Sequence, residues 1–255
     1  MNQTERIRNI TKIISNKRRI SIKELSQKTF YSTSTLRRDL IFLENQGYIT
    51  RKHGEVILNS FNTKEMSHYI RESENRVSKR TIASLAKQFV KSGMCIFLDA
   101  STTVYELCPY LCEIENLIVF TNGLNTAQKL SEFANPSMKI FITGGEIKHY
   151  SSSVINLDIE HSLINHFNID LAICSATGID DHFVYEASLS QAMSKKRVMD
   201  KATETLLLID SSKFYHTGFF KINSINHYKA IISDKFPPTN LLKNCEDQGV
   251  DWISK

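Results

Sequence analysis

The segment "STSTLRRDLIFLENQGYITRKHGE", residues 32–55, combines three arginines, a lysine and a histidine with a regular apolar stripe. The stripe consists of leucines at helical spacing, Leu36, Leu40 and Leu43. Ser32 stands where a helix N-cap is expected, and Gly47 stands where the helix would end. The pattern therefore predicts a helix that buries its leucines and begins at a hydroxyl cap.

The opposite face of this helix is polar and basic. At about 100° per residue, four side chains fall on the arc away from the leucines: Thr33, Ser34, Arg37 and Arg38. Arginine can hold guanine through two hydrogen bonds, and hydroxyl side chains contact bases or phosphates. An apolar repeat at Ile7, Ile10, Ile13 and Ile14, and a capping box from Ser21 to Glu24, predict two preceding helices. This order of helices predicts a helix-turn-helix whose last helix contacts bases in the major groove of DNA.

The residues after Gly47 predict a small β-hairpin. "YITRKHGEVIL", residues 48–58, contains two β-prone runs that bend at "KHG". Arg51, Lys52 and His53 would lie near the tip, where a wing can contact the DNA backbone or minor groove. A solvated hairpin with no role in binding is the alternative, since hairpin tips are usually polar.

The distribution of charge agrees with a DNA-binding amino-terminal region. Residues 1 to 60 contain 12 Lys and Arg against 5 Asp and Glu, whereas the remainder contains 20 against 22. A basic module on a near-neutral body indicates that the module meets a polyanion. No apolar run approaches the roughly 20 residues of a membrane span, and the amino end does not resemble a secretory signal, so we expect a cytoplasmic protein without membrane contact. Five cysteines, without zinc-like spacing of a second Cys/His pair, predict reduced thiols and no metal.

Residues 21–55 resemble the winged helix-turn-helix of the DeoR family of bacterial transcriptional regulators. The positions that match the family's motif are Ser32, Thr35, Leu36, Arg37, Arg38, Asp39, Leu40, Gly47, Arg51, His53 and Gly54. Tyr31 and Glu55 depart from it, and Glu55 places a negative charge where the wing has a second glycine. The polar helix face, the hairpin tip and the resemblance together predict that DNA is bound by Ser32, Thr33, Ser34, Thr35, Arg37, Arg38, Arg51, Lys52 and His53.

From Gly93 onward, apolar runs of strand length alternate with helix-like stretches. The runs are "MCIFLD", "LIVFT", "MKIFIT", "LAICSA", "LLLID" and "KAIIS". Unalternating apolar strands separated by helices are typical of a mostly parallel α/β sheet with both faces covered. We therefore expect a winged helix-turn-helix domain at residues 1–60, a linker at 61–75 and an α/β effector domain at 76–255.

Small, hydroxylated or charged residues follow these runs, and the carboxyl ends of parallel strands line one crevice. The candidate effector-binding residues are Asp99, Ser101, Thr102, Thr103, Thr121, Asn122, Gly144, Gly145, Asp210 and Lys213. Hydroxyls and backbone N–H groups at Ser101 to Thr103 would hold a phosphate, Gly144 and Gly145 would let backbone approach it, and Lys213 would add a positive charge. Asp99 and Asp210 would accept hydrogen bonds from sugar hydroxyls. Each ending alone is also explained as an ordinary turn.

The family resemblance extends to this half through "IFLDASTT", "TNGLN", "TGGEI" and "LIDSSKF". It implies a sugar-phosphate isomerase-like fold that senses a phosphorylated sugar, with Ala100-Ser101 in place of the family's Ser-Gly. The implied function is a repressor of a carbohydrate operon, with operator DNA and the sugar phosphate as partners and no cofactor.

Two other functions compete with this one. A sugar-phosphate isomerase with a basic appendage is disfavoured because "SATGID" replaces the aspartate-rich stretch of such enzymes, and the helix that follows Glu186 reads as a basic solvated face. A domain that only oligomerises is the other alternative. Paired operator half-sites predict a homodimer or larger homo-oligomer in either case.

Overall fold

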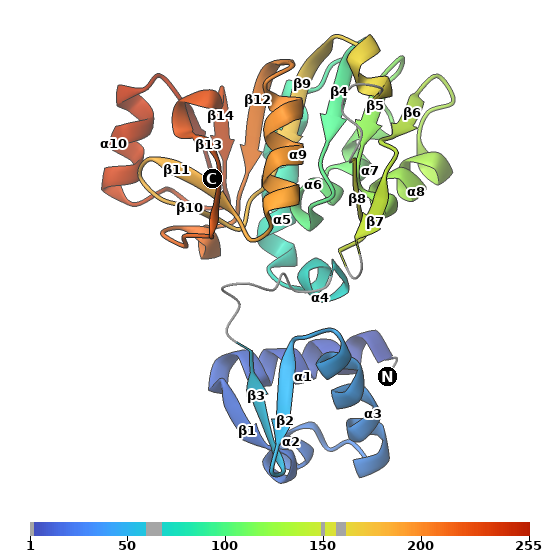
Figure 1. The fold of residues 1–255 in the computed structure, drawn as a ribbon, viewed down its shortest axis with the longest axis vertical. Coiled ribbons are helices and arrows are strands. Elements are labelled where there is room, and N and C mark those ends of the chain that lie inside the picture. The colour runs from blue at the N-terminus through green and yellow to red at the C-terminus, as the bar shows by residue number, and fades with distance from the viewer. Residues whose placement is uncertain (1–2, 60–67, 149–150, 157–161) are drawn as a thin grey trace. The chain divides into compact units, whose positions relative to one another are not determined.

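The computed structural model describes residues 3–59, 68–148, 151–156 and 162–255. The chain divides into two compact units, Met1–Glu74 and Asn75–Lys255, and each is described by itself (Figure 1). Within the described residues, no helix is both long enough and apolar enough to cross a membrane.

The first unit is a winged helix-turn-helix. Its helices are α1 (Gln3–Lys17), α2 (Ile22–Thr29), α3 (Thr33–Asn45) and α4 (His68–Ser73). Its strands are β1 (Arg19–Ser21), β2 (Ile49–Lys52) and β3 (Glu55–Leu58), which form an antiparallel sheet in the order β1-β3-β2. Strand β1 was not expected from the sequence, because three residues between two helices are too few to show a period-2 pattern.

The helical spacing of the isoleucines and leucines explains the core of this unit. Ile7, Ile10 and Ile14 of α1 are fully buried against the α3 leucine stripe. The Ser21 and Ser32 side chains accept backbone N–H bonds at the starts of α2 and α3, as their positions predicted. Helix α4 lies within residues 61–75, which the sequence suggested as a linker, and its Ile70 packs into this core.

A seven-stranded parallel sheet forms the centre of the second unit (Figure 1). Its strand order is β15-β14-β12-β9-β4-β5-β6. The strands are β4 (Cys95–Leu98), β5 (Ile118–Thr121), β6 (Lys139–Ile142), β9 (Ile169–Cys174), β12 (Ala202–Leu208), β14 (Ala230–Ile232) and β15 (Asp251–Ile253). All six predicted apolar runs are strands of this sheet, whereas β15, with its intermediate burial, was missed.

The two faces of the sheet bury separate cores. One face packs against α5 (Arg76–Ala86), α6 (Thr102–Tyr105), α7 (Cys108–Leu111) and α8 (Leu124–Phe133). The other packs against α9 (Leu189–Met199), α10 (Thr239–Asp247) and the short helix η2 (Leu163–His166). Alternation along β4 divides its side chains, with Ile96 and Leu98 in the first core and Cys95 and Phe97 in the second.

Smaller elements complete the second unit. Strands β10 (Gly178–Ile179), β11 (Phe183–Glu186) and β13 (Phe220–Ser224) form an antiparallel sheet, and β7 (Glu146–Lys148) pairs with β8 (Ser153–Ile155). Three further short helices are η1 (Lys87–Phe89), η3 (Ser211–Lys213) and η4 (Ile225–His227). Ser153 of β8 forms a β-bridge with Gly123, which follows β5, and Ile179 of β10 forms one with Phe214, which follows η3.

Candidate functional site

The outer face of α3 carries the predicted reading residues. The Ser32 hydroxyl accepts the Thr35 backbone N–H at 3.3 Å, which fixes the start of the helix. Thr33, Ser34, Arg37 and Arg38 are all exposed. Arg37 makes no hydrogen bond or ion pair with a described residue, and the one bond from Arg38 Nε, to the Ser34 carbonyl, is long at 3.5 Å. Both guanidinium groups are therefore available for an external partner.

A buried ion pair holds α3 against α1. The Arg6 guanidinium donates to Asp39 at 2.7 Å from Nε and at 3.1 Å from Nη2, and Asp39 is completely buried. The Asp39 hydrogen bond raises the pKa of Arg6 above its ordinary value. A two-point contact restricts rotation of the helix, so it orients the face that carries Arg37 and Arg38.

The wing has a two-residue turn at His53 and Gly54, whose φ values are +50° and +77°. Positive φ at both positions matches the twist of a tight hairpin. Lys52 and His53 are exposed at the tip. Arg51 instead donates to Glu44 at 2.8 Å from Nε and 2.6 Å from Nη2, which ties the wing to the end of α3.

Glu55, the departure from the family's wing motif, has a partner within the wing. Its carboxylate accepts from Arg19 Nε at 2.8 Å, across the β1–β3 pair. The added negative charge is therefore balanced locally by Arg19, and the exposed side chains of Lys52 and His53 at the tip are not part of this ion pair.

In the second unit, Asp99 lies at the centre of a closed polar cluster. One of its oxygens accepts the Ser101 backbone N–H at 2.9 Å, and the other accepts the Ser175 N–H at 2.9 Å. Lys195 Nζ lies 3.0 Å from the same second oxygen. The side chain is fully buried, so both carboxylate oxygens are engaged inside the protein.

Lys195 joins Asp99 to Glu186. Its ammonium donates to Glu186 Oε2 at 2.6 Å and to the Ser175 carbonyl at 2.7 Å. Burial by itself lowers the pKa of Lys195, but the two carboxylates outweigh it and raise that pKa above its ordinary value. The prediction that Glu186 and the following helix form only a solvated basic face was wrong for these two residues. The missed signal is that Lys195 lies on the same helical stripe as Ala192, Val198 and Met199.

A second cluster forms where α5 meets the ends of β4 and β12. Lys79 Nζ donates to the Thr102 hydroxyl at 3.0 Å, and both side chains are buried. Asn75 Nδ2 donates to Asp210 at 3.1 Å and to the Ser212 hydroxyl at 3.0 Å. Lys79 was missed by the sequence analysis, although a lysine on the apolar stripe of Ile82, Ala83 and Ala86 is a recognisable signal.

Lys213 is the last residue of η3 and directly follows Ser212, a member of this cluster. Its side chain is half-buried and makes no hydrogen bond or ion pair with any residue that the structure describes. Asp210 caps η3 by accepting the Ser212 backbone N–H at 3.2 Å. The capped short helix η3 therefore carries a cation that has no partner in the described parts of the chain.

The remaining candidates lie at or after the end of β5, which pairs with β4, and after β6, which is an edge strand. Four strand spacings separate β12 from β6, or roughly 19 Å, which is more than one small sugar phosphate spans. Thr121 Oγ1 accepts the Gly123 N–H at 3.0 Å, and Asn122 contacts the Val154 carbonyl at 3.4 Å. A Cβ at Gly145 would lie 2.2 Å from the Ile155 carbonyl, so this glycine allows the chain to pass β8. Candidates that follow β12 and β6 are thus too far apart to contact the same small ligand, and which of the ten bind an effector stays a prediction.

Comparison with known proteins matches both halves of the chain. Residues 6–61 match the DeoR-like helix-turn-helix domain, and residues 74–235 match the DeoR C terminal sensor domain. The lactose phosphotransferase system repressor of Streptococcus mutans serotype c is 33% identical over 92% of this chain and 93% of its own length. The glycerol-3-phosphate regulon repressor of Escherichia coli is 27% identical over 98% of both chains. Among solved structures, ribose 5-phosphate isomerase A of Methanocaldococcus jannaschii is 17% identical over 55% of each chain, with a TM-score of 0.41.

Proposed function

The chain belongs to the DeoR family of transcriptional regulators, and from this premise we propose that it represses a carbohydrate operon until a phosphorylated sugar binds its second unit. The observation that carries the proposal is that one chain has both an exposed basic face on α3 and a buried Lys79–Thr102 contact at the carboxyl end of β4. The first feature fits DNA, and the second fits a phosphate.

The DNA-binding half of the proposal rests on Arg37 and Arg38. Their exposed guanidinium groups lie on a helix that Ser32 caps and Arg6 holds through Asp39. Arginines of this kind grip guanine in the major groove, while Lys52 and His53 at the wing tip suit the phosphate backbone. Arg51 has a structural partner in Glu44, so we assign it to positioning the wing.

The effector half rests on residues of α5 and on residues that follow β4 and β12, the two neighbours of the central strand β9. Lys79, Thr102 and Thr103 provide a cation and two hydroxyls for a phosphate, and Lys213 adds a second cation. Asp210 and Asn75 would bind the sugar hydroxyls. The names of the relatives, which refer to lactose transport and to glycerol 3-phosphate, support a small phosphorylated sugar or polyol as the ligand.

The second unit would act as a sensor and not as an enzyme. Proton transfer at a sugar carbon needs a carboxylate free to exchange a proton. Both oxygens of Asp99 are engaged, and Glu186 is bonded to Lys195 and to the Ala187 backbone. This arrangement supports ligand binding coupled to operator affinity, with a coupling of about 5- to 150-fold as is typical of allosteric proteins.

A homodimer is part of the proposal. Recognition helices that read paired half-sites must lie one helical turn of DNA apart, which takes two copies. Sedimentation of the purified protein, alone and with a two-half-site operator, tests this point. A single copy on an intact palindrome at saturation would contradict it.

The DNA-binding proposal is tested with an operator selected from random duplex DNA. Arg38→Ala should lower affinity for the selected sequence by about 1 to 3 kcal/mol and relax the preference at one base pair, while Lys52→Ala should weaken all sequences alike. Lys243→Ala removes a charge from exposed α10 and serves as the control. Unchanged binding by both Arg38→Ala and Lys52→Ala would overturn the proposed docking.

The effector proposal is tested by thermal stability in the presence of phosphorylated sugars and their unphosphorylated forms. A ligand at 100 times its dissociation constant should add about 2.7 kcal/mol of stability. The paired change Thr102→Ala/Thr103→Ala should abolish the response to the phosphorylated form and leave operator binding intact. A retained response would place the phosphate elsewhere.

A further inference from the structure

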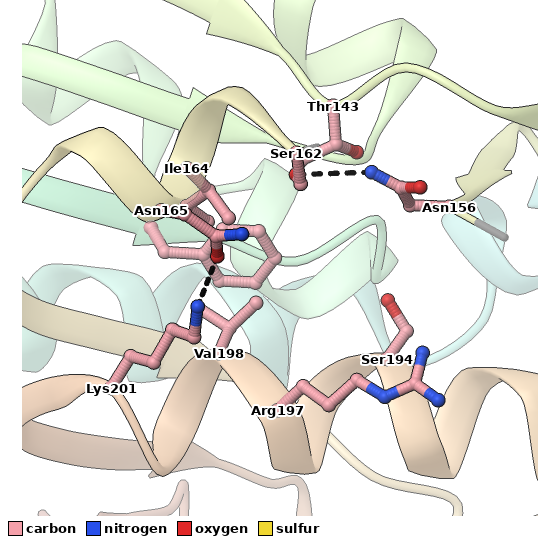
Figure 2. Close-up of a pocket in the computed structure, with 10 residues that line it drawn as sticks. Thr143, Asn156, Ser162, Ile164, Asn165, Ser194, Arg197, Val198 and Lys201 are labelled. Carbon is pink, nitrogen blue, oxygen red and sulfur yellow. Dashed lines mark hydrogen bonds between the residues drawn. The ribbon is translucent and has the colours of Figure 1, made fainter. Parts of the chain in front are cut away.

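A hollow lies on the opposite face of the sheet from the buried contact of Lys79 (α5) with Thr102 (α6), called the α5–α6 cluster below. It is bordered by the carboxyl-terminal half of α9, by η2 and by Phe97 of β4 (Figure 2). Phe97, Ile164 and Val198 belong to the core on the α9 face, whereas Ile82 of α5 and Val104 of α6 belong to the core on the other face. The two sites are therefore separated by the sheet.

The charge of this hollow is positive. The described residues that line it include Arg197 and Lys201 and no carboxylate. Lys201 donates a hydrogen bond to Asn165. Arg197 is half-buried and makes no hydrogen bond or ion pair with any residue in the described parts of the chain. A partly buried guanidinium without an acceptor lacks the compensation that such groups usually have.

Polar atoms converge on the same space. The Thr143 hydroxyl oxygen is buried and has no hydrogen-bond partner among the described residues. Asn156 Nδ2 donates to the Ser162 hydroxyl at 3.0 Å across from α9. Figure 2 shows the Ser194 hydroxyl and the Arg197 guanidinium projecting from α9 toward this side, with Thr143 and Asn156 opposite. Hydroxyl and amide donors thus accompany the guanidinium.

The hollow has a volume of about 50 Å³, several times the roughly 10 to 15 Å³ that one buried water needs. Phe97, Ile164 and Val198 provide an apolar wall. The space therefore suits a small group with a charged head and a short apolar body.

We propose that this hollow is a second ligand site, which binds a small oxyanion such as a phosphate or a carboxylate through Arg197. The planar guanidinium matches two oxygens of either group, and Ser194 and Thr143 supply hydroxyls for the remaining oxygens. Because Arg197 and Lys195 lie on the same helix, the bound anion fixes the helix that also holds Asp99.

The test measures binding of inorganic phosphate and of butyrate by isothermal titration to the full-length protein. The Thr102→Ala/Thr103→Ala background removes phosphate binding at the α5–α6 cluster, so failure of the proposed effector site is distinguishable from failure of this one. We expect at least one of the two anions to bind in that background. Arg197→Ala should weaken binding by at least about tenfold, and Arg197→Lys by less, because a lysine keeps the charge without the fork.

Lys196→Ala is the matched control, since Lys196 is the adjacent cation on α9 but pairs with Asp200 and Asn223. It should leave anion binding unchanged. Circular dichroism melts verify that each variant is folded. The proposal is overturned if neither anion binds the background protein, or if Arg197→Ala and Lys196→Ala bind with the same affinity as that protein. Binding of phosphate alone or butyrate alone identifies the head group.

Discussion

The ammonium of Lys195 lies 2.6 Å from the carboxylate of Glu186, with exposed fractions of only 9% and 3% for the two side chains. Asp99 shares the same ammonium at 3.0 Å and is fully buried. Two carboxylates and one cation therefore occupy the interior, where an unpaired charge is strongly unfavourable. Lys195 thus determines whether this region of the second unit can remain folded.

Replacing Lys195 by Met should destabilise the second unit by about 3 to 5 kcal/mol, because Asp99 and Glu186 would lose their buried counter-ion. Urea unfolding, followed by fluorescence, measures the change. Lys196→Met, on the exposed side of the same helix, should cost less than about 1 kcal/mol. Equal effects of the two substitutions would show that the buried cluster does not bear on stability.

Phe30 follows α2 in the left-handed conformation, with a φ of +57°, and is 92% exposed. A bulky residue is strained there, whereas glycine is not, and little buried surface would be lost. Phe30→Gly should therefore raise the unfolding free energy of the first unit by about 0.5 to 1 kcal/mol. Phe133→Gly, at an exposed helical position of α8, should lower stability instead. A lower melting temperature for Phe30→Gly than for the unchanged protein would contradict the explanation by backbone strain.

Gly178 lets β10 pass the backbone of the segment after η3. A Cβ at this position would lie 1.8 Å from the His216 carbonyl oxygen, whereas a Cβ at Gly144 would have no atom of the described residues within 4 Å. Gly178→Ala should cost at least about 1 to 3 kcal/mol because backbone must shift, while Gly144→Ala should change stability by less than about 0.5 kcal/mol. Chemical denaturation of both variants decides this, and a neutral Gly178→Ala would mean that the two segments separate readily.

The contact between Glu44 and Arg51 predicts a pH dependence in the first unit. The hydrogen bonds from Arg51 hold the pKa of Glu44 below its ordinary value. The stabilisation is present above the unfolded pKa of about 4.3 and is lost as pH falls through the lower folded pKa. Its size should be about 0.2 to 1 kcal/mol, because both side chains are partly exposed. Glu44→Gln should remove this part of the acid sensitivity of the melting temperature, and an unchanged profile would exclude the contact as its source.

The sequence alone identified the DNA-binding half almost completely. Ser21 and Ser32 each cap a helix by a hydrogen bond to a residue three positions along the chain, and the leucines repeat at helical spacing. These local patterns were sufficient to predict α2 and α3. Six of the seven sheet strands could also be predicted, since a strand covered on both faces is a continuous apolar run. The edge strand β6 shows the same apolar run although it is only partly buried. What the resemblance added was the family and the expected ligand class.

In the second unit, local sequence patterns did not predict which side chains contact one another. The sequence predicts that ten strand-end residues line one crevice, and only the strand order shows that those after β12 and those after β6 lie four spacings apart. The engagement of Asp99 by Lys195, the pairing of Arg51 with Glu44 and the contact of Lys79 with Thr102 all join residues that other elements bring together. Their spacing along the chain carries little information about such contacts.

The positions of the capped helices and of the apolar strands were thus determined by the sequence itself, because caps and periodic patterns depend on residues within one or two turns. The accessibility of a charged side chain was decided only by the tertiary structure. A lysine on an apolar stripe, such as Lys79 or Lys195, is buried only because another element supplies its acceptor. That acceptor lies 23 residues away in one case and nine in the other, and the free energy of burying the charge depends on it.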